Sequence, residues 1–121
     1  MKRHDFARMV SLILTWIISK GWYPLIGDAN RSRYEQNRLW RVGRDQEGNK
    51  VGKTLTNCDG VKNVSAHQYE DARGRYGIDI LIHTGDGNVD KDEVYKEAHE
   101  YWSSLGGEPM IPWDGGHWEA K

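Results

Sequence analysis

Apolar residues recur with helical spacing near the start of the chain. Between Asp5 and Ser19 they are separated by three or four positions, which places them on one face of a helix. Gly21 follows, and glycine is the residue that most readily takes the left-handed conformation that ends a helix. The pattern predicts a helix from about Asp5 to Ser19, whose buried face consists of Phe6, Met9, Val10, Ile13, Leu14, Ile17 and Ile18.

Three segments show strand patterns instead. Residues Trp22 to Ile26 predict a short strand directly after the first helix. The clearest strand signal is the run from Ile78 to Ile82, in which isoleucines alternate with Asp79 and Leu81. Near the end of the chain, His117 to Glu119 reads as an extended segment that closes a sheet.

Two more helices are predicted between these strands. One runs from Tyr34 to about Val42, with Leu39 and Trp40 facing inward. The other begins with Asp90 as N-cap, three residues before Glu93, and stops at the glycine pair 106–107. Its apolar stripe consists of Val94, Ala98, Tyr101, Trp102 and Leu105.

The polar region from the second helix to Asn63 is long and poor in apolar residues. Such a pattern is typical of a loop that is either functional or mobile, and it makes this region a candidate wall of a cleft. At 121 residues the chain has room for one core. We therefore expect a single domain over residues 1–121, of the α+β class. It should contain a small antiparallel sheet with helices packed on one side and a zinc site in a surface cleft.

The net charge and the cysteine content exclude several kinds of partner and metal site. Seventeen Lys and Arg against eighteen Asp and Glu leave a net charge of -1, too little to attract nucleic acid or anionic lipid over a distance. The single cysteine, Cys58, excludes an internal disulfide and a four-cysteine zinc site. Any metal site must therefore use His, Asp and Glu.

The N-terminus needs a separate test, since Lys2 and Arg3 before an apolar run can imitate a signal peptide. The helical spacing favours a core helix, and the apolar run is about half the roughly 20 residues needed to span a bilayer. We expect no membrane insertion, and a location in the bacterial cytoplasm before release to the cell wall.

Two histidines and an aspartate are candidates for a metal site. His67 follows the polar region, and Asp79 lies among isoleucines, where a carboxylate is costly to desolvate unless a cation or hydrogen-bond donors hold it. His117 follows Gly115 and Gly116, for which we expect unusual backbone angles that let a carboxylate and an imidazole point the same way. Together the three residues offer two imidazoles and one carboxylate.

Three motifs in order resemble a known family. They are Arg31-Ser32-Arg33-Tyr34-Glu35-Gln36-Asn37-Arg38-Leu39, Ser65-Ala66-His67, and Asp114-Gly115-Gly116-His117-Trp118-Glu119. The chain resembles, over most of its length, the zinc peptidases that include D-Ala-D-Ala carboxypeptidases, vancomycin-resistance D,D-dipeptidases and phage L-alanyl-D-glutamate endolysins. The Met1-Lys2-Arg3 start, the Tyr101 to Gly107 segment and the Asp-Gly-Gly-His ending look most like the compact endolysin branch.

The resemblance implies a role for each matching residue. It implies zinc ligated by His67, an aspartate and His117, with Asp114 as the general base and acid. It implies that Arg31 binds a substrate carboxylate or polarises the scissile carbonyl. Ser65 and Gln36 would contact the substrate or line the cleft, and Glu119 would orient His117 from behind.

The aspartate ligand is open between two residues. The segment from His67 to the predicted strand is longer than in the family, and an insertion at Glu70 to Gly74 would make Asp79 the ligand. Asp71 is the competing choice, four residues after His67 and able to share a helical face with it. Asp79 is favoured because a strand fixes its position.

The implied function is hydrolysis of an amide bond in a peptidoglycan stem peptide by a monomer. An endolysin would cut between L-Ala and D-Glu, whereas a carboxypeptidase would remove the terminal D-Ala, and the sequence does not choose between them. The alternative from another class is a cell-wall-binding or phage structural module that keeps the fold without catalysis. A metal-dependent nuclease is disfavoured by the near-neutral charge.

Overall fold

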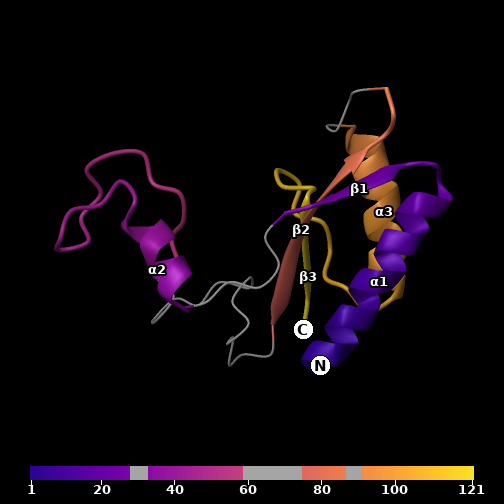
Figure 1. Cartoon of the computed structure of the whole chain (residues 1–121), viewed down its shortest axis with the longest axis horizontal. Coiled ribbons are helices and arrows are strands. Elements are labelled where there is room, and N and C mark those ends of the chain that lie inside the picture. Colours follow the sequence, from indigo (N-terminus) through magenta and orange to yellow (C-terminus); the bar gives the residue numbers. More distant parts are fainter. Residues whose placement is uncertain (28–32, 59–74, 87–90) are drawn as a thin grey trace.

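The computed structural model describes residues 1–27, 33–58, 75–86 and 91–121. These parts contain three helices and a three-stranded antiparallel sheet, so the predicted α+β class with a small antiparallel sheet is confirmed (Figure 1). In chain order the elements are α1 (Arg3–Ser19), β1 (Tyr23–Ile26), α2 (Arg33–Arg41), β2 (Tyr76–His83), α3 (Asp92–Ser104) and β3 (His117–Ala120).

The sheet has β2 at its centre, with β1 and β3 on its two sides. Both neighbours run antiparallel to β2, with Leu25 opposite Leu81 in one pair and Asp79 opposite His117 in the other. The last strand of the chain therefore lies beside a strand almost forty positions earlier, and this pairing brings two of the predicted ligands together.

The two faces of the sheet differ because side chains alternate along each strand. Ile78, Ile80 and Ile82 are buried on the inner face, which α1 and α3 cover (Figure 1). The residues between them on β2 point the other way. We call this second surface the outer face, and it carries Tyr23, Leu25, Asp79, Leu81, His83, His117 and Glu119.

The core lies between the inner face and the two helices. α1 contributes Met9, Ile13 and Ile17, and α3 contributes residues that include Ala98 and Trp102. Trp102 and Trp118 meet edge to face, with ring centroids 5.8 Å apart. Each buried indole N–H has a partner: Trp102 Nε1 donates to the Glu119 carbonyl at 2.9 Å, and Trp118 Nε1 donates to the Ile80 carbonyl at 3.1 Å. These bonds fix β3 against both α3 and β2.

The helix ends follow the predicted glycine stops. Gly21 (φ 80°) comes directly after Lys20, the C-cap of α1, and Gly106 (φ 101°) follows Leu105, the C-cap of α3. The N-cap prediction for the last helix was wrong. Its N-cap is Lys91, with no capping bond from its side chain, and Asp90 lies outside the described residues.

The segment 33–58 is held by local polar contacts. Asp45 Oδ1 accepts hydrogen bonds from the backbone N–H groups of Glu47 and Asn49. The backbones of Arg44 and Lys50 pair across this turn as an isolated antiparallel β-bridge. Gly43 has φ 78°, and a Cβ there would collide with the Lys53 backbone. The part of the predicted polar loop up to residue 58 therefore has a defined local structure.

The length and the apolar content of a helix decide whether it can cross a bilayer. In these four ranges of the chain, none of the helices combines the length and the apolar content that a membrane span requires.

Candidate functional site

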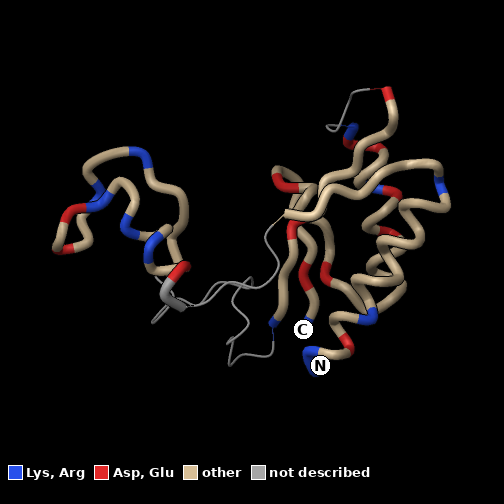
Figure 2. The backbone as a smooth tube through the Cα atoms, viewed as in Figure 1, with Lys and Arg blue, Asp and Glu red and all other residues tan. Residues whose placement is uncertain are grey.

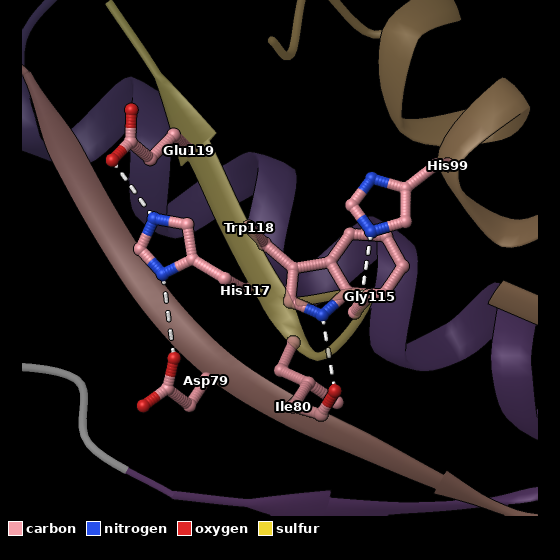
Figure 3. A network of polar contacts seen from close by, with 7 residues as sticks. All are labelled: Asp79, Ile80, His99, Gly115, His117, Trp118 and Glu119. Atoms are coloured by element: carbon pink, nitrogen blue, oxygen red, sulfur yellow. Dashed lines mark hydrogen bonds and ion pairs between the residues drawn. The ribbon is translucent and has the colours of Figure 1, made fainter. Parts of the chain in front are cut away.

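An aspartate, a histidine and a glutamate meet on the outer face of the sheet (Figure 3). The register of β2 and β3 puts Asp79 opposite His117, with 3.4 Å between Asp79 Oδ1 and His117 Nδ1. The other ring nitrogen, His117 Nε2, lies 2.8 Å from Glu119 Oε1. Both nitrogens of one imidazole therefore face carboxylate oxygens.

His117 is held tightly in this arrangement, since its side chain is only 10% exposed. Burial by itself lowers the pKa of the imidazole, but the hydrogen bonds and negative charges of Asp79 and Glu119 outweigh it and raise the pKa of His117 to about 9. Without a metal, the group at neutral pH is an imidazolium between two carboxylates.

Asp79 is not buried among the isoleucines that flank it in sequence. Strand alternation turns its side chain to the outer face, where it is 40% exposed, while Ile78 and Ile80 enter the core. The desolvation cost expected from its neighbours was therefore overstated. What holds Asp79 in position is the strand register opposite His117.

Asp114 stands between two consecutive turns. Its N–H donates to the Ile111 carbonyl at 3.0 Å, and its own carbonyl accepts from the His117 N–H at 3.1 Å. Pro112 occupies the second position of the first turn, where its restricted φ is favoured. The Asp114 carboxylate is exposed and makes no hydrogen bond or ion pair with any described residue.

Asp79 and Asp114 open onto the same depression in the surface, which we call the site hollow. Its volume is about 460 Å³, and it is lined by Leu25, Ile26, Gly27, Asp79, Leu81, Asp114 and Gly116. Its apolar lining comes partly from Leu25 and Ile26 of β1, and the turn that carries Asp114 contributes to it as well. A peptide in this hollow would contact both the ligand candidate and the base candidate.

The glycines before His117 serve close packing. Gly115 and Gly116 do not have positive φ, so the prediction of unusual backbone angles was wrong. A Cβ on Gly115 would lie 3.1 Å from the Tyr95 side chain, and one on Gly116 would lie 2.9 Å from Leu81 Cδ2. A Cβ at position 115 would press on the Tyr95 side chain near its backbone, and a Cβ at position 116 would require the Leu81 methyl group to shift.

Two residues of α3 support this turn. The sequence pattern leaves His99 as a structural or solvated residue and assigns no role to Tyr95. His99 Nε2 lies 2.8 Å from the Gly115 carbonyl; since a carbonyl only accepts, this nitrogen carries the proton. The His99 ring stacks on Trp118 with centroids 3.7 Å apart, and burial lowers its pKa. Tyr95 contacts the same turn and accepts a hydrogen bond from the Ile82 N–H at 3.0 Å. Their spacing of four residues on one helix face was the available signal.

Five further residues were predicted for the site, and only Gln36 among them belongs to the described part of the chain. Arg31, Ser65, His67 and the alternative ligand Asp71 lie outside the described residues. Gln36 is fully buried, and its amide donates to the Cys58 carbonyl at 2.8 Å and to Thr56 Oγ1 at 3.3 Å. In this conformation its amide serves the packing of the segment 33–58.

A catalytic zinc site needs three protein ligands, drawn here from His, Asp and Glu side chains, and one open position. Within the described ranges, no group of three or more His, Cys, Asp or Glu residues is arranged to hold a metal. The Asp79 and His117 pair offers two donors. Bonds of about 2.0 to 2.15 Å in a tetrahedral zinc site separate neighbouring ligand atoms by roughly 3.3 to 3.5 Å. The observed 3.4 Å falls within that range.

Glu119 matches a second requirement. A histidine that binds a metal through one nitrogen usually donates its other N–H to a carboxylate or carbonyl, which sets the tautomer and the ring direction. His117 Nε2 has such a partner in Glu119, which leaves Nδ1 directed at Asp79. The described residues therefore offer two possible donor atoms and a carboxylate beside the second ring nitrogen, and by themselves they do not form a metal site.

Comparison with known proteins adds no family to this description. No known family's sequence profile matches the chain, and no curated protein matches it. The resemblance to the zinc peptidases thus depends on the three short sequence motifs alone.

Proposed function

We propose that this chain is a zinc-dependent peptidase that hydrolyses an amide bond in peptidoglycan stem peptides. The specific activity that we propose is that of a phage-type L-alanyl-D-glutamate endopeptidase. The observation that carries the proposal is the 3.4 Å spacing of Asp79 Oδ1 and His117 Nδ1, with Glu119 behind the imidazole. His67 is the proposed third ligand, taken from the sequence motif.

Zinc, when bound, would act as a Lewis acid and would lower the pKa of the water molecule bound to it. Asp114 accepts a proton from the attacking water and passes it to the leaving amine nitrogen. Its exposed carboxylate lines the site hollow together with Asp79, which favours this assignment. Arg31 would hold a substrate carboxylate with its planar fork. We further propose that the protein acts as a monomer and stays in the bacterial cytoplasm before it is released to the wall.

A test of this function combines metal analysis with product analysis. The purified full chain, incubated with zinc and dialysed, should retain about one zinc per chain by plasma mass spectrometry. Digestion of purified peptidoglycan should then give new termini that identify the bond: D-Glu and L-Ala termini for the endolysin, or free D-Ala for the carboxypeptidase. His117→Ala and Asp79→Asn should lose zinc, whereas Asp114→Ala should keep zinc and lose cleavage.

His83→Ala is the matched control for His117→Ala. His83 is a histidine on the same face of the same sheet, and its Nδ1 accepts a hydrogen bond from the Gly85 N–H at 3.1 Å, away from Asp79. This variant should retain both zinc and activity. Equal zinc loss in the two histidine variants would contradict the proposed ligand set.

The second candidate is a non-catalytic wall-binding module. The observation in its favour is that His117 already has a carboxylate at each ring nitrogen and a pKa raised to about 9, so the three side chains satisfy one another without a metal. A chain that binds peptidoglycan but neither retains zinc nor produces new termini would establish this alternative and end the peptidase proposal.

A further inference from the structure

A second hollow adjoins the site hollow on the other side of the Asp114 turn. We call it the tryptophan hollow. Its volume is about 380 Å³, and it is walled by Asp92 and Tyr95 of α3 and by Met110, Pro112 and Trp113. It shares Leu81, Asp114 and Gly116 with the site hollow. A ligand that extends across Asp114 would therefore occupy both.

The charge of the tryptophan hollow is negative. Of its lining residues that the structure describes, Asp92 and Asp114 are carboxylates and none is basic. Neither carboxylate makes a hydrogen bond or ion pair with a described residue. The nearest lysine in sequence, Lys91, directs its ammonium group to Asp86 instead. The hollow is thus complementary to a cation.

Trp113 supplies the apolar part. It is 87% exposed, the highest value among the exposed large hydrophobic residues. One exposed aromatic residue is unremarkable by itself. A tryptophan ring that lines the same hollow as two carboxylates, however, is a combination suited to ammonium groups, because the ring quadrupole and the carboxylates attract the same charge. The described residues that line the site hollow include no aromatic side chain, and β1 contributes Leu25 and Ile26 to that lining.

We propose that the tryptophan hollow is a specificity subsite for a primary ammonium group on the substrate, such as the side-chain amine of a diamino acid near the cleaved bond. The inference rests on the proposed peptidase function and deepens it by naming a chemical feature of the substrate. Since Asp114 lines both hollows, an ammonium bound at Trp113 and Asp92 positions the rest of the peptide beside the proposed base.

The experiment measures binding in the absence of metal, so that it does not depend on cleavage. The full-length protein in EDTA is titrated by calorimetry with the peptide L-Ala-γ-D-Glu-L-Lys-D-Ala. The same titration is repeated with the peptide acetylated at the lysine Nε and, separately, at the N-terminal amine. Loss upon Nε acetylation identifies the side-chain amine as the occupant, and loss upon N-terminal acetylation identifies the terminal amine.

Acetylation of the occupying amine should weaken binding about tenfold. Trp113→Ala and Asp92→Asn should each weaken binding of the free-amine peptide severalfold and leave binding of the acetylated peptide unchanged. Glu93→Gln is the matched control: it removes one charge at the next, exposed position of α3 but does not line the hollow, so it should bind as wild type. Far-UV circular dichroism checks that each variant is folded.

The proposal is overturned if all three peptides bind equally, if none of them binds, or if Glu93→Gln weakens binding as much as Asp92→Asn. Its failure can be told from failure of the peptidase function. Zinc retention and cleavage with no preference for a free amine would remove only the subsite, whereas amine-dependent binding without zinc or cleavage would retain the subsite in a binding module.

Discussion

The sheet with α1 and α3 is held together differently from the segment 33–58. The first has an apolar core in which Trp102 and Trp118 pack edge to face. The indole N–H groups of both tryptophans donate hydrogen bonds to backbone carbonyls. The second is fixed by polar side chains that bond to nearby backbone, while Val51 and Leu55 remain 70% and 61% exposed. One region is stabilised by burial and the other by local geometry.

The charges of the two regions differ as well. Residues 33–58 contain six basic residues, Arg33, Arg38, Arg41, Arg44, Lys50 and Lys53, against three acidic ones, Glu35, Asp45 and Glu47. Figure 2 shows Lys and Arg recurring along this segment, whereas acidic residues predominate from α3 to the C-terminus. The proposed ligands Asp79 and His117 belong to the region with the apolar core, so their spacing is set by the register of β2 and β3.

The largest expected effect comes from breaking the apolar core. Trp118→Ala should lower the free energy of unfolding by about 3 to 5 kcal/mol, because it leaves a cavity against Trp102 and an unpaired Ile80 carbonyl. Val51→Ala in the other region should change it by less than about 0.5 kcal/mol. Urea denaturation followed by circular dichroism measures both, and similar losses would refute the contrast.

The next effect tests the turn above the sheet. Gly116→Ala should cost about 1 to 3 kcal/mol and reduce cleavage, because the new Cβ would lie 2.9 Å from Leu81 Cδ2. The double variant Leu81→Ala with Gly116→Ala should recover part of the lost stability, since the colliding atom is gone. Strictly additive losses in thermal melts would show that this contact is not the cause.

A smaller effect is expected in the polar segment. Gln36→Ala removes the donor to the Cys58 carbonyl, which should destabilise residues 33–58 by about 1 to 2 kcal/mol. Amide hydrogen exchange should speed up there and stay unchanged in β2. Arg38→Ala serves as the control, because the exposed Arg38 and Glu35 pair contributes little. Faster exchange throughout the sheet would mean that the two regions are not held independently.

The smallest effect is a pH dependence from His99. Burial lowers its pKa below the ordinary 6.5, so below about pH 6.5 the unfolded chain takes up a proton that the folded protein does not. His99 therefore contributes stability above pH 6.5 that is lost as the pH falls toward the folded pKa, with a slope of at most about 1.4 kcal/mol per pH unit. Urea midpoints from pH 7 to pH 5 should show less of this slope in His99→Phe.

Sequence alone determined the elements whose signals are local. The helix α1, the isoleucine alternation of β2 and the stops at Gly21 and Gly106 are all present in the structure, because helical and strand periods are set by the backbone itself. The prediction of Ile18 on the buried face of α1 was wrong, since Ile18 is 60% exposed. The extended ending at His117 was predicted for the same reason. Fold class followed from the number and kind of these elements.

Only the tertiary structure decided how the site residues meet. Strand register set Asp79 against His117, and the covering of one sheet face by helices left both on the other face. Close contacts with Tyr95 and Leu81, rather than backbone angles, explain Gly115 and Gly116. Such facts depend on which distant segments touch, and a local pattern in the chain carries no information about the partner across the sheet.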